Sequence, residues 1–163
     1  MQQKQITITY NEYSAEELSA WQENLIVKSV EAQTTSYSPY SHFKVGAAIL
    51  LEDESIVLGS NQENAAYPSG LCAERVAIFS CGVIHPAKKI KAIAISASTH
   101  KFDLNELLAP CGACRQSMLE YEHRQDEEIK ILLKGVDSQV VEFNSVKDLL
   151  PIPFNCDALQ NVS

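Results

Sequence analysis

The sequence has few of the features that direct a protein to a membrane or to a nucleic acid. Its first ten residues contain no long apolar segment, so they predict neither a signal peptide nor a membrane span. Lysine and arginine number only 13 against 21 aspartates and glutamates, which gives a formal net charge of −8. An acidic chain repels a phosphate backbone, and the densest basic run, Lys88–Lys91, is short. We therefore expect no membrane partner and no nucleic-acid partner.

Cysteine is present in an odd number, five, which does not suit a secreted framework of paired disulfides. Thiols held for a metal fit a reducing compartment, and we expect the protein to be cytoplasmic. No internal repeat or low-complexity linker divides the 163 residues, which are enough for one domain with a substantial core. The sequence predicts an amino-terminal extension at residues 1–13, a single domain at residues 14–155 and a tail at residues 156–163.

Helical and strand patterns alternate along the chain and predict an α/β fold. Helices are expected, with approximate ends, at residues 14–33, 70–81, 112–122 and 145–150. Apolar runs predict five strands, at residues 43–51, 56–60, 90–98, 129–133 and 140–143. We also consider a helical turn around residues 105–108 and a turn at residues 135–138. This order predicts a three-layer α/β/α arrangement around a mixed five-stranded sheet.

Two short stretches carry the residues with the most specific chemistry. Cys72 lies in the first stretch, and Cys111 and Cys114 form a Cys-x-x-Cys pair 39 residues further on (111 − 72). That separation leaves room for a crossover to a neighbouring strand, so we expect the cysteines to open two helices at one point beside the sheet. Helix amino termini favour thiolates, and a Cys-x-x-Cys pair on one helical turn can reach one ion.

Three thiols with an open fourth position predict a catalytic zinc site that holds one Zn²⁺ per subunit. A redox pair or a structural half-site would explain a single Cys-x-x-Cys equally simply. The third cysteine, Cys72, argues against these alternatives because Glu74 follows it by two residues.

Glu74 and Arg75 have ordinary and catalytic interpretations. A glutamate in a first helical turn is usually a solvated carboxylate, but beside zinc it is placed to move protons. Zinc would lower the pKa of a water molecule from about 15.7 to roughly 7, and Glu74 would carry the released proton to the substrate. Arg75 is either a surface charge or a donor to the cysteine sulfurs that eases the negative charge of three thiolates.

A Cys-x-Glu followed by Pro-Cys-x-x-Cys is the pattern of the zinc nucleobase deaminases. From about Tyr37 to Phe154, the sequence strongly resembles the small homotetrameric cytidine deaminases whose zinc ligands are all cysteine. The resemblance is carried by YSPYSHFKVGAA (Tyr37–Ala48), NQENAAY (Asn61–Tyr67), GLCAER (Gly70–Arg75), PCGACRQ (Pro110–Gln116) and LLP (Leu149–Pro151).

The resemblance implies the same three-layer fold and a homotetramer whose active sites borrow residues from neighbouring subunits. It also implies zinc-dependent hydrolytic deamination of cytidine and 2′-deoxycytidine to uridine and 2′-deoxyuridine, with release of ammonia, in pyrimidine salvage.

Several further residues are candidates for substrate binding. Asn61 and Glu63 alternate at the end of a strand, so their side chains face the same side and either bind sugar hydroxyls or form a polar turn. The resemblance implies that they hold the ribose. Phe43 and Phe154 are each either core aromatics or flat surfaces for cytosine, and the resemblance implies substrate contact, with Phe154 coming from a neighbouring subunit.

Tyr67 is either a core tyrosine or, as the resemblance implies, a residue that reaches toward a neighbouring subunit's ligand. Backbone groups near Ala73 and Cys111 would orient the 4-amino end of the base, again by resemblance.

Two other functions remain open at this point. The first is a related deaminase that acts on a cytosine-nucleoside antibiotic, against which Asn61, Glu63 and Arg75 together argue. The second is a zinc-stabilised module that binds nucleic acid or protein without catalysis. The acidic charge, the open fourth metal position and Glu74 argue against this second alternative.

Overall fold

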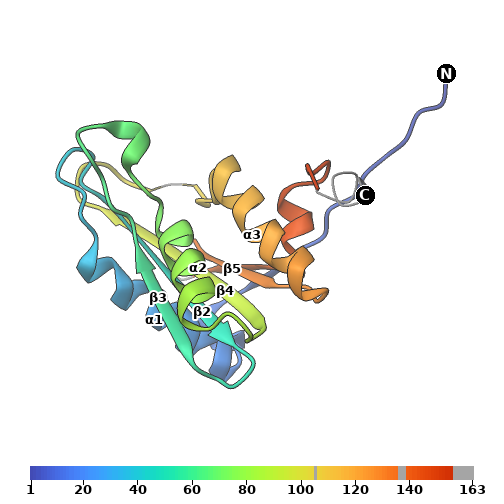
Figure 1. Cartoon of the computed structure of the whole chain (residues 1–163), viewed down its shortest axis with the longest axis horizontal. Coiled ribbons are helices and arrows are strands. Elements are labelled where there is room, and N and C mark those ends of the chain that lie inside the picture. The colour runs from blue at the N-terminus through green and yellow to red at the C-terminus, as the bar shows by residue number, and fades with distance from the viewer. Residues whose placement is uncertain (105, 136–138, 156–163) are drawn as a thin grey trace.

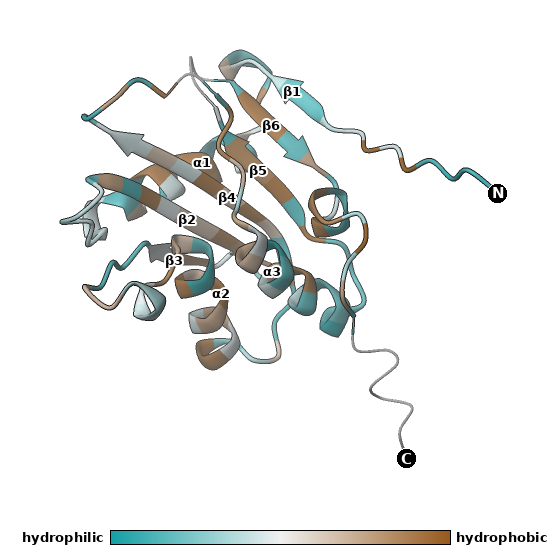
Figure 2. Ribbon diagram, turned by 90° about the horizontal axis from the view of Figure 1, so that it is seen from above, coloured by the Kyte–Doolittle hydropathy of each residue, from teal (hydrophilic) through white to brown (hydrophobic). Residues whose placement is uncertain are grey.

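One mixed β-sheet runs through the whole molecule (Figures 1 and 2). The computed structural model describes residues 1–104, 106–135 and 139–155. Within them the sheet has six strands in the order β1-β6-β5-β4-β2-β3, and β4 and β5 run parallel while the other neighbours are antiparallel. The strands are β1 (Asn11–Tyr13), β2 (Phe43–Leu51), β3 (Ile56–Ser60), β4 (Ile90–Thr99), β5 (Lys130–Lys134) and β6 (Val140–Phe143).

The prediction of five strands was wrong because residues 11–13 add a sixth strand at the edge of the sheet. β1 pairs antiparallel with β6, Asn11 opposite Glu142 and Tyr13 opposite Val140. Its three residues, Asn-Glu-Tyr, show no apolar alternation and are largely exposed. The backbone of β6 supplies the pairing partners, and a sequence pattern does not reveal a free edge of this kind.

Three α-helices and several short 3₁₀ turns surround the sheet. The helices are α1 (Ala20–Ala32), α2 (Ala73–Ile84) and α3 (Gly112–Gln125), and the 3₁₀ turns are η1 (Ala15–Glu17), η2 (Gln33–Thr35), η3 (Tyr67–Ser69) and η5 (Val146–Leu149). None of the described helices has the length and apolar character that crossing a membrane requires.

The first helix begins later than its capping pattern predicted. Ser14 donates its backbone N–H and its hydroxyl to Glu17, but this capping box closes only the single turn η1. Leu18 is extended, and a second box, in which Ser19 donates to Gln22, opens α1. Two capping boxes in succession match the sequence pattern equally well, and the tertiary packing decides which of them opens the long helix.

Two other expectations concern connections. Residues 106–108 are not helical, and residue 105 lies outside the described residues, as do residues 136–138 of the expected turn. The helices predicted to end near residues 81 and 122 continue to Ile84 and Gln125.

The helices form two layers on opposite faces of the sheet, which confirms the predicted α/β/α arrangement (Figure 2). α1 packs Leu25 and Ile26 against one face of the sheet. α2, α3 and η5 cover the other face, where Ile49 points from β2 and Ile93 from β4. Adjacent residues such as Ile93 and Ala94 therefore belong to different cores, because successive side chains in a strand point to opposite faces.

The backbone of β3 lies unusually close to the backbone of α2. A Cβ atom built on Gly59 of β3 would lie 2.6 Å from the carbonyl oxygen of Ala73 and 2.5 Å from the amide nitrogen of Ala77. Only glycine lets the backbone of β3 approach the first turns of α2 this closely.

Glu122 holds α3 in place. Its side chain is 2 % exposed and accepts hydrogen bonds from the Ile129 N–H at 2.9 Å, the Val146 N–H at 2.8 Å and the Ser145 hydroxyl at 2.7 Å. One buried side chain therefore joins α3 to the entrance of β5 and to η5.

We predict that Gly59→Ala lowers the free energy of unfolding by about 3 kcal/mol, because the added methyl meets backbone atoms that cannot move aside. Chemical denaturation of the purified variant measures the change. Gly112→Ala is the matched control, since a Cβ on Gly112 at the start of α3 meets no heavy atom within 4 Å. Equal stability of the two variants would contradict the close packing of α2 on β3.

Candidate active site

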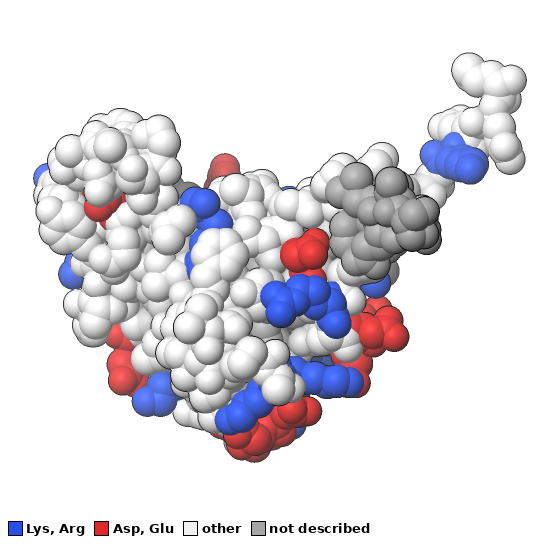
Figure 3. Space-filling model, viewed as in Figure 1, with Lys and Arg blue, Asp and Glu red and all other residues white. Residues whose placement is uncertain are grey.

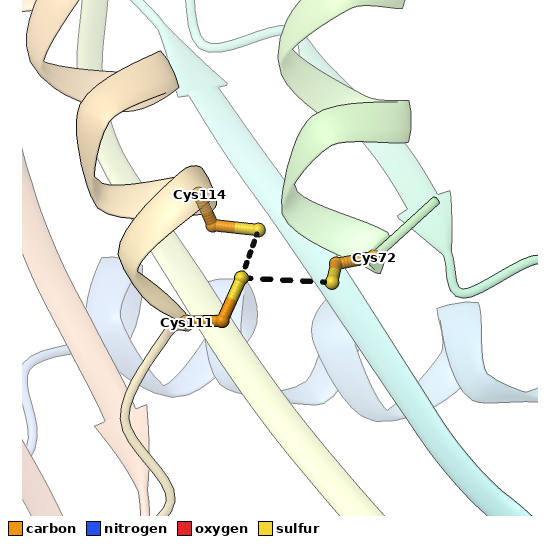
Figure 4. Close-up of side chains that lie close together, drawn as sticks. All are labelled: Cys72, Cys111 and Cys114. Carbon is orange, nitrogen blue, oxygen red and sulfur yellow. Dashed lines mark hydrogen bonds between the residues drawn. The ribbon is translucent and has the colours of Figure 1, made fainter. Parts of the chain in front are cut away.

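Three cysteine sulfurs meet where α2 and α3 begin (Figure 4). Cys72 and Cys111 are the residues immediately before α2 and α3, and Cys114 lies in the first turn of α3. The Cys72 Sγ is 3.9 Å from the Cys111 Sγ, which is 3.4 Å from the Cys114 Sγ. All three sulfurs lie within 4.8 Å of one another. The predicted convergence of two helix amino termini is therefore present.

The sulfurs share protons unevenly. The pKa of Cys72 is lowered to about 5, chiefly by a hydrogen bond from Cys114, against the opposing effect of burial, and with help from Arg75. The pKa of Cys114 is raised, because this thiol keeps the proton that it donates to Cys72 and is buried. Without a cation the cluster therefore resists losing its protons together.

The donor set fits zinc. The two helix amino termini stabilise thiolates, and zinc is readily bound by soft sulfur ligands. A divalent cation among the three sulfurs would remove their competition for protons. Among the residues that the structure describes, the group contains three candidate ligands and no fourth histidine, cysteine, aspartate or glutamate. A site with three protein ligands is typical of catalytic zinc, whereas structural zinc normally has four.

A cavity of about 870 Å³ adjoins the cluster. Cys72, Cys111 and Glu74 line it, whereas Cys114 is fully buried behind them. Glu74 is only 5 % exposed, and its pKa is raised, first by burial and then by the negative charge of Cys72. A buried carboxyl group with a raised pKa is chemically able to accept and release protons beside the three cysteines.

Arg75 also lines the cavity, next to the sulfurs. Burial alone would lower its pKa, but interactions with Cys72 and Cys114 raise it. Its Nε is buried and has no hydrogen-bond partner among the described residues. The interactions of the guanidinium with Cys72 and Cys114 are the arrangement expected of a group that offsets thiolate charge.

Asn61 and Glu63 both line the cavity beyond the end of β3. The Asn61 Oδ1 accepts from the Ser36 hydroxyl at 2.5 Å and from the Val45 N–H at 2.9 Å, and its Nδ2 donates to the Phe43 carbonyl at 2.8 Å. Asn61 therefore also supports the start of β2.

Glu63 likewise holds the loop at residues 40–41 in place by hydrogen bonds. Its carboxylate accepts from the Ser41 hydroxyl, from the Tyr40 N–H at 2.9 Å and from the Ser41 N–H at 3.3 Å. Burial opposes ionisation, but these hydrogen bonds hold the pKa of Glu63 below its usual value.

Two of the three aromatic residues predicted to bind substrate line the cavity, and the third does not. Phe43 and Tyr67 line the cavity, and Tyr67 is 76 % exposed. Phe154 does not line it within this chain; the side chain is 70 % exposed, and its carbonyl accepts from the Gln116 side chain at 2.9 Å. Ala73 is fully buried at the start of α2 and does not line the cavity either.

Sequence reasoning missed several residues that line the cavity. They include Tyr40, Phe102, Leu108 and Lys134. Phe102 had a signal, because it is the one phenylalanine between β4 and α3. Lys134 had none, since a lysine at the end of a strand is ordinarily solvated.

Comparison with known proteins identifies the family. A model of the cytidine and deoxycytidylate deaminase zinc-binding region matches residues 19–126. Cytidine deaminase of Halalkalibacterium halodurans is 36 % identical over 137 residues, which cover 84 % of this chain and 96 % of that protein. Cytidine deaminase of Sporosarcina psychrophila is 39 % identical over 137 residues, which cover 84 % of this chain and 93 % of that protein.

Solved structures agree with this result. The crystal structure of cytidine deaminase from Burkholderia pseudomallei matches with a TM-score of 0.69 and 37 % identity, over 80 % of this chain and 97 % of that one. The matched family region includes all three clustered cysteines and Glu74. The chain therefore belongs to the cytidine deaminase family.

Proposed function

We propose that this protein converts cytidine and 2′-deoxycytidine to uridine and 2′-deoxyuridine, with release of ammonia, for pyrimidine salvage. The proposal rests on one observation: the cluster of three cysteine sulfurs and the buried Glu74 lie together beside one cavity. We also propose a cytoplasmic location, because the three thiols must stay reduced to hold a metal.

Cys72, Cys111 and Cys114 would hold one Zn²⁺ per chain. When bound, the ion acts as a Lewis acid that lowers the pKa of water to about 7. Arg75 would donate to the sulfurs and limit the charge that they place on the ion.

Glu74 moves the protons of the reaction. Its carboxylate accepts one proton from the attacking water and delivers it to N3 of the base. It then accepts the second proton, from the hydroxyl formed at C4, and delivers it to the departing amine, which leaves as ammonia while the C4 carbonyl forms. Cys72 is the cap of α2 and Glu74 lies in its first turn, so one helix fixes the distance between metal ligand and proton carrier. Backbone groups near Ala73 and Cys111 would orient the 4-amino end.

Asn61 and Glu63 retain the hydrogen-bonding capacity that a ribose needs. Of the two Nδ2 hydrogens of Asn61, one is used within the described chain, so one donor remains. The Glu63 carboxylate accepts three hydrogen bonds and has about four acceptor positions, so one acceptor remains. One donor and one acceptor suit sugar hydroxyls, and Phe43 would contact the base.

We further propose that the protein assembles as a homotetramer. α2 presents an apolar surface in which Phe79, Val83 and Ile84 are 44 %, 81 % and 62 % exposed. Figure 3 shows an uncharged surface over much of this helix. A second copy covering α2 would shield that surface, and Tyr67 and Phe154 would complete neighbouring sites.

Zinc binding should depend on the clustered cysteines and not on buried cysteine in general. We predict that Cys114→Ala reduces bound zinc from about one ion per chain to a small fraction. Elemental analysis of the purified protein measures the ion. Cys81→Ala is the matched control, because Cys81 is also buried but lies outside the cluster, and it should retain its zinc. A wild-type protein without zinc would refute the site.

Glu74→Gln should fold and hold zinc normally but lose turnover by about 10²–10⁴-fold, because the amide cannot carry protons. Loss of cytidine absorbance in the ultraviolet measures the rate. Glu120→Gln on α3 is the control, since Glu120 is exposed and does not line the cavity.

The same assay separates substrate classes. Wild-type activity confined to cytosine-nucleoside antibiotics would replace the proposed substrate, and full activity of Glu74→Gln would refute the role of this residue.

The apolar surface of α2 predicts a defect in assembly. Val83→Glu should shift the protein to smaller species in analytical ultracentrifugation, because a charge on this surface cannot be buried between copies. Val27→Glu introduces the same charge at a 55 % exposed valine of α1 and should leave the oligomer intact. A wild-type monomer, or equal effects of both variants, would contradict assembly through α2.

A further inference from the structure

The connection between β4 and α3 forms one wall of the cavity. It contributes Phe102, Leu108 and Ala109 to the lining. Leu108 and Ala109 lie next to Pro110 and the metal-ligand motif, so their position follows from that motif. Phe102 lies further back in the chain, and its position needs a separate explanation.

Two ring contacts place Phe102 over the start of β2. Thr99, the last residue of β4, pairs with Phe43, the first residue of β2. The next residue, His100, has its ring centroid 5.6 Å from that of His42. The Phe102 ring then lies 6.2 Å from the Phe43 ring, and the two planes differ by only 12°. Two neighbouring ring pairs thus join the segments that begin β2 and follow β4.

The ring of Phe102 has a large uncovered surface. The residue is 57 % exposed although it lies against the cavity, and Phe43 beside it is half-buried. Because the Phe102 ring stacks nearly parallel to the Phe43 ring, a planar ligand can lie against the uncovered face of Phe102 and extend the stack. A flat heteroaromatic base would cover apolar area that the folded chain leaves in water.

We propose that Phe102 is a specificity-determining residue that forms, with Phe43, an aromatic wall for the pyrimidine base. This inference rests on the proposed deaminase function. Phe102 belongs to neither cysteine motif and is not among the metal ligands, so its ring contributes to binding the base and not to proton transfer. Its loss should therefore appear in KM and in product affinity, with kcat little changed.

The test compares Phe102→Ala, Phe102→Tyr and Leu107→Ala. KM and kcat are measured with cytidine, and the Kd of uridine is measured by calorimetry. Stacking of one base on one aromatic ring predicts a rise of about tenfold in KM and in Kd for Phe102→Ala. Phe102→Tyr keeps the planar ring and should restore both constants. Leu107→Ala removes a 41 % exposed side chain from the same connection but outside the cavity lining, and it should behave as wild type.

The outcomes separate this inference from the function on which it rests. An active wild type with an unchanged KM and Kd in Phe102→Ala overturns the role of Phe102 alone. A lower melting temperature of Phe102→Ala without a change in either constant also overturns it, because the ring then only covers Phe43. A wild type that does not deaminate cytidine overturns the proposed function and this inference together.

Discussion

The concentration of three sulfurs at one point is the constraint on which the rest of the structure depends. Three thiolates this close together would repel one another, so the cluster either keeps protons between its sulfurs or has positive charge to compensate it. The amino termini of α2 and α3 supply part of that charge, and the Arg75 guanidinium supplies more. A cation held by the three sulfurs would complete the compensation. The fold must therefore hold two helix ends together against their tendency to separate.

Two separate features resist that separation. Gly59 allows the backbone of β3 to contact the first turns of α2, which fixes Cys72 and Glu74 relative to the sheet. Glu122 binds α3 to the entrance of β5 and to η5 through three buried hydrogen bonds. Both helices pack on the same face of one sheet, so the sheet fixes the positions of their amino termini relative to each other. Metal ligands on packed helices are positioned more precisely than ligands on loops.

The part of the cavity lined by Asn61 and Glu63 is held differently. Asn61 and Glu63 lie in a connection, and each uses most of its hydrogen-bonding capacity to support the chain around it. Each nevertheless keeps one position for a ligand. In the proposed function the same side chains would both support the chain and bind the sugar, because a polar group that is already oriented loses little entropy when a hydroxyl binds.

The sequence by itself determined the chemistry. The Cys-x-Glu and Cys-x-x-Cys spacings, together with the helical pattern around them, identified the cluster and Glu74, because ligand spacing within one turn is a local property. Buried strands such as β4 were also readable, since an apolar run at residues 90–98 has few alternatives. Only the tertiary structure decided the sixth strand, the start of α1 at Ala20 instead of near Ser14, and the place of Phe102 beside Phe43. Each of these depends on contacts between segments far apart in the chain, and such contacts leave no periodic pattern in either segment alone.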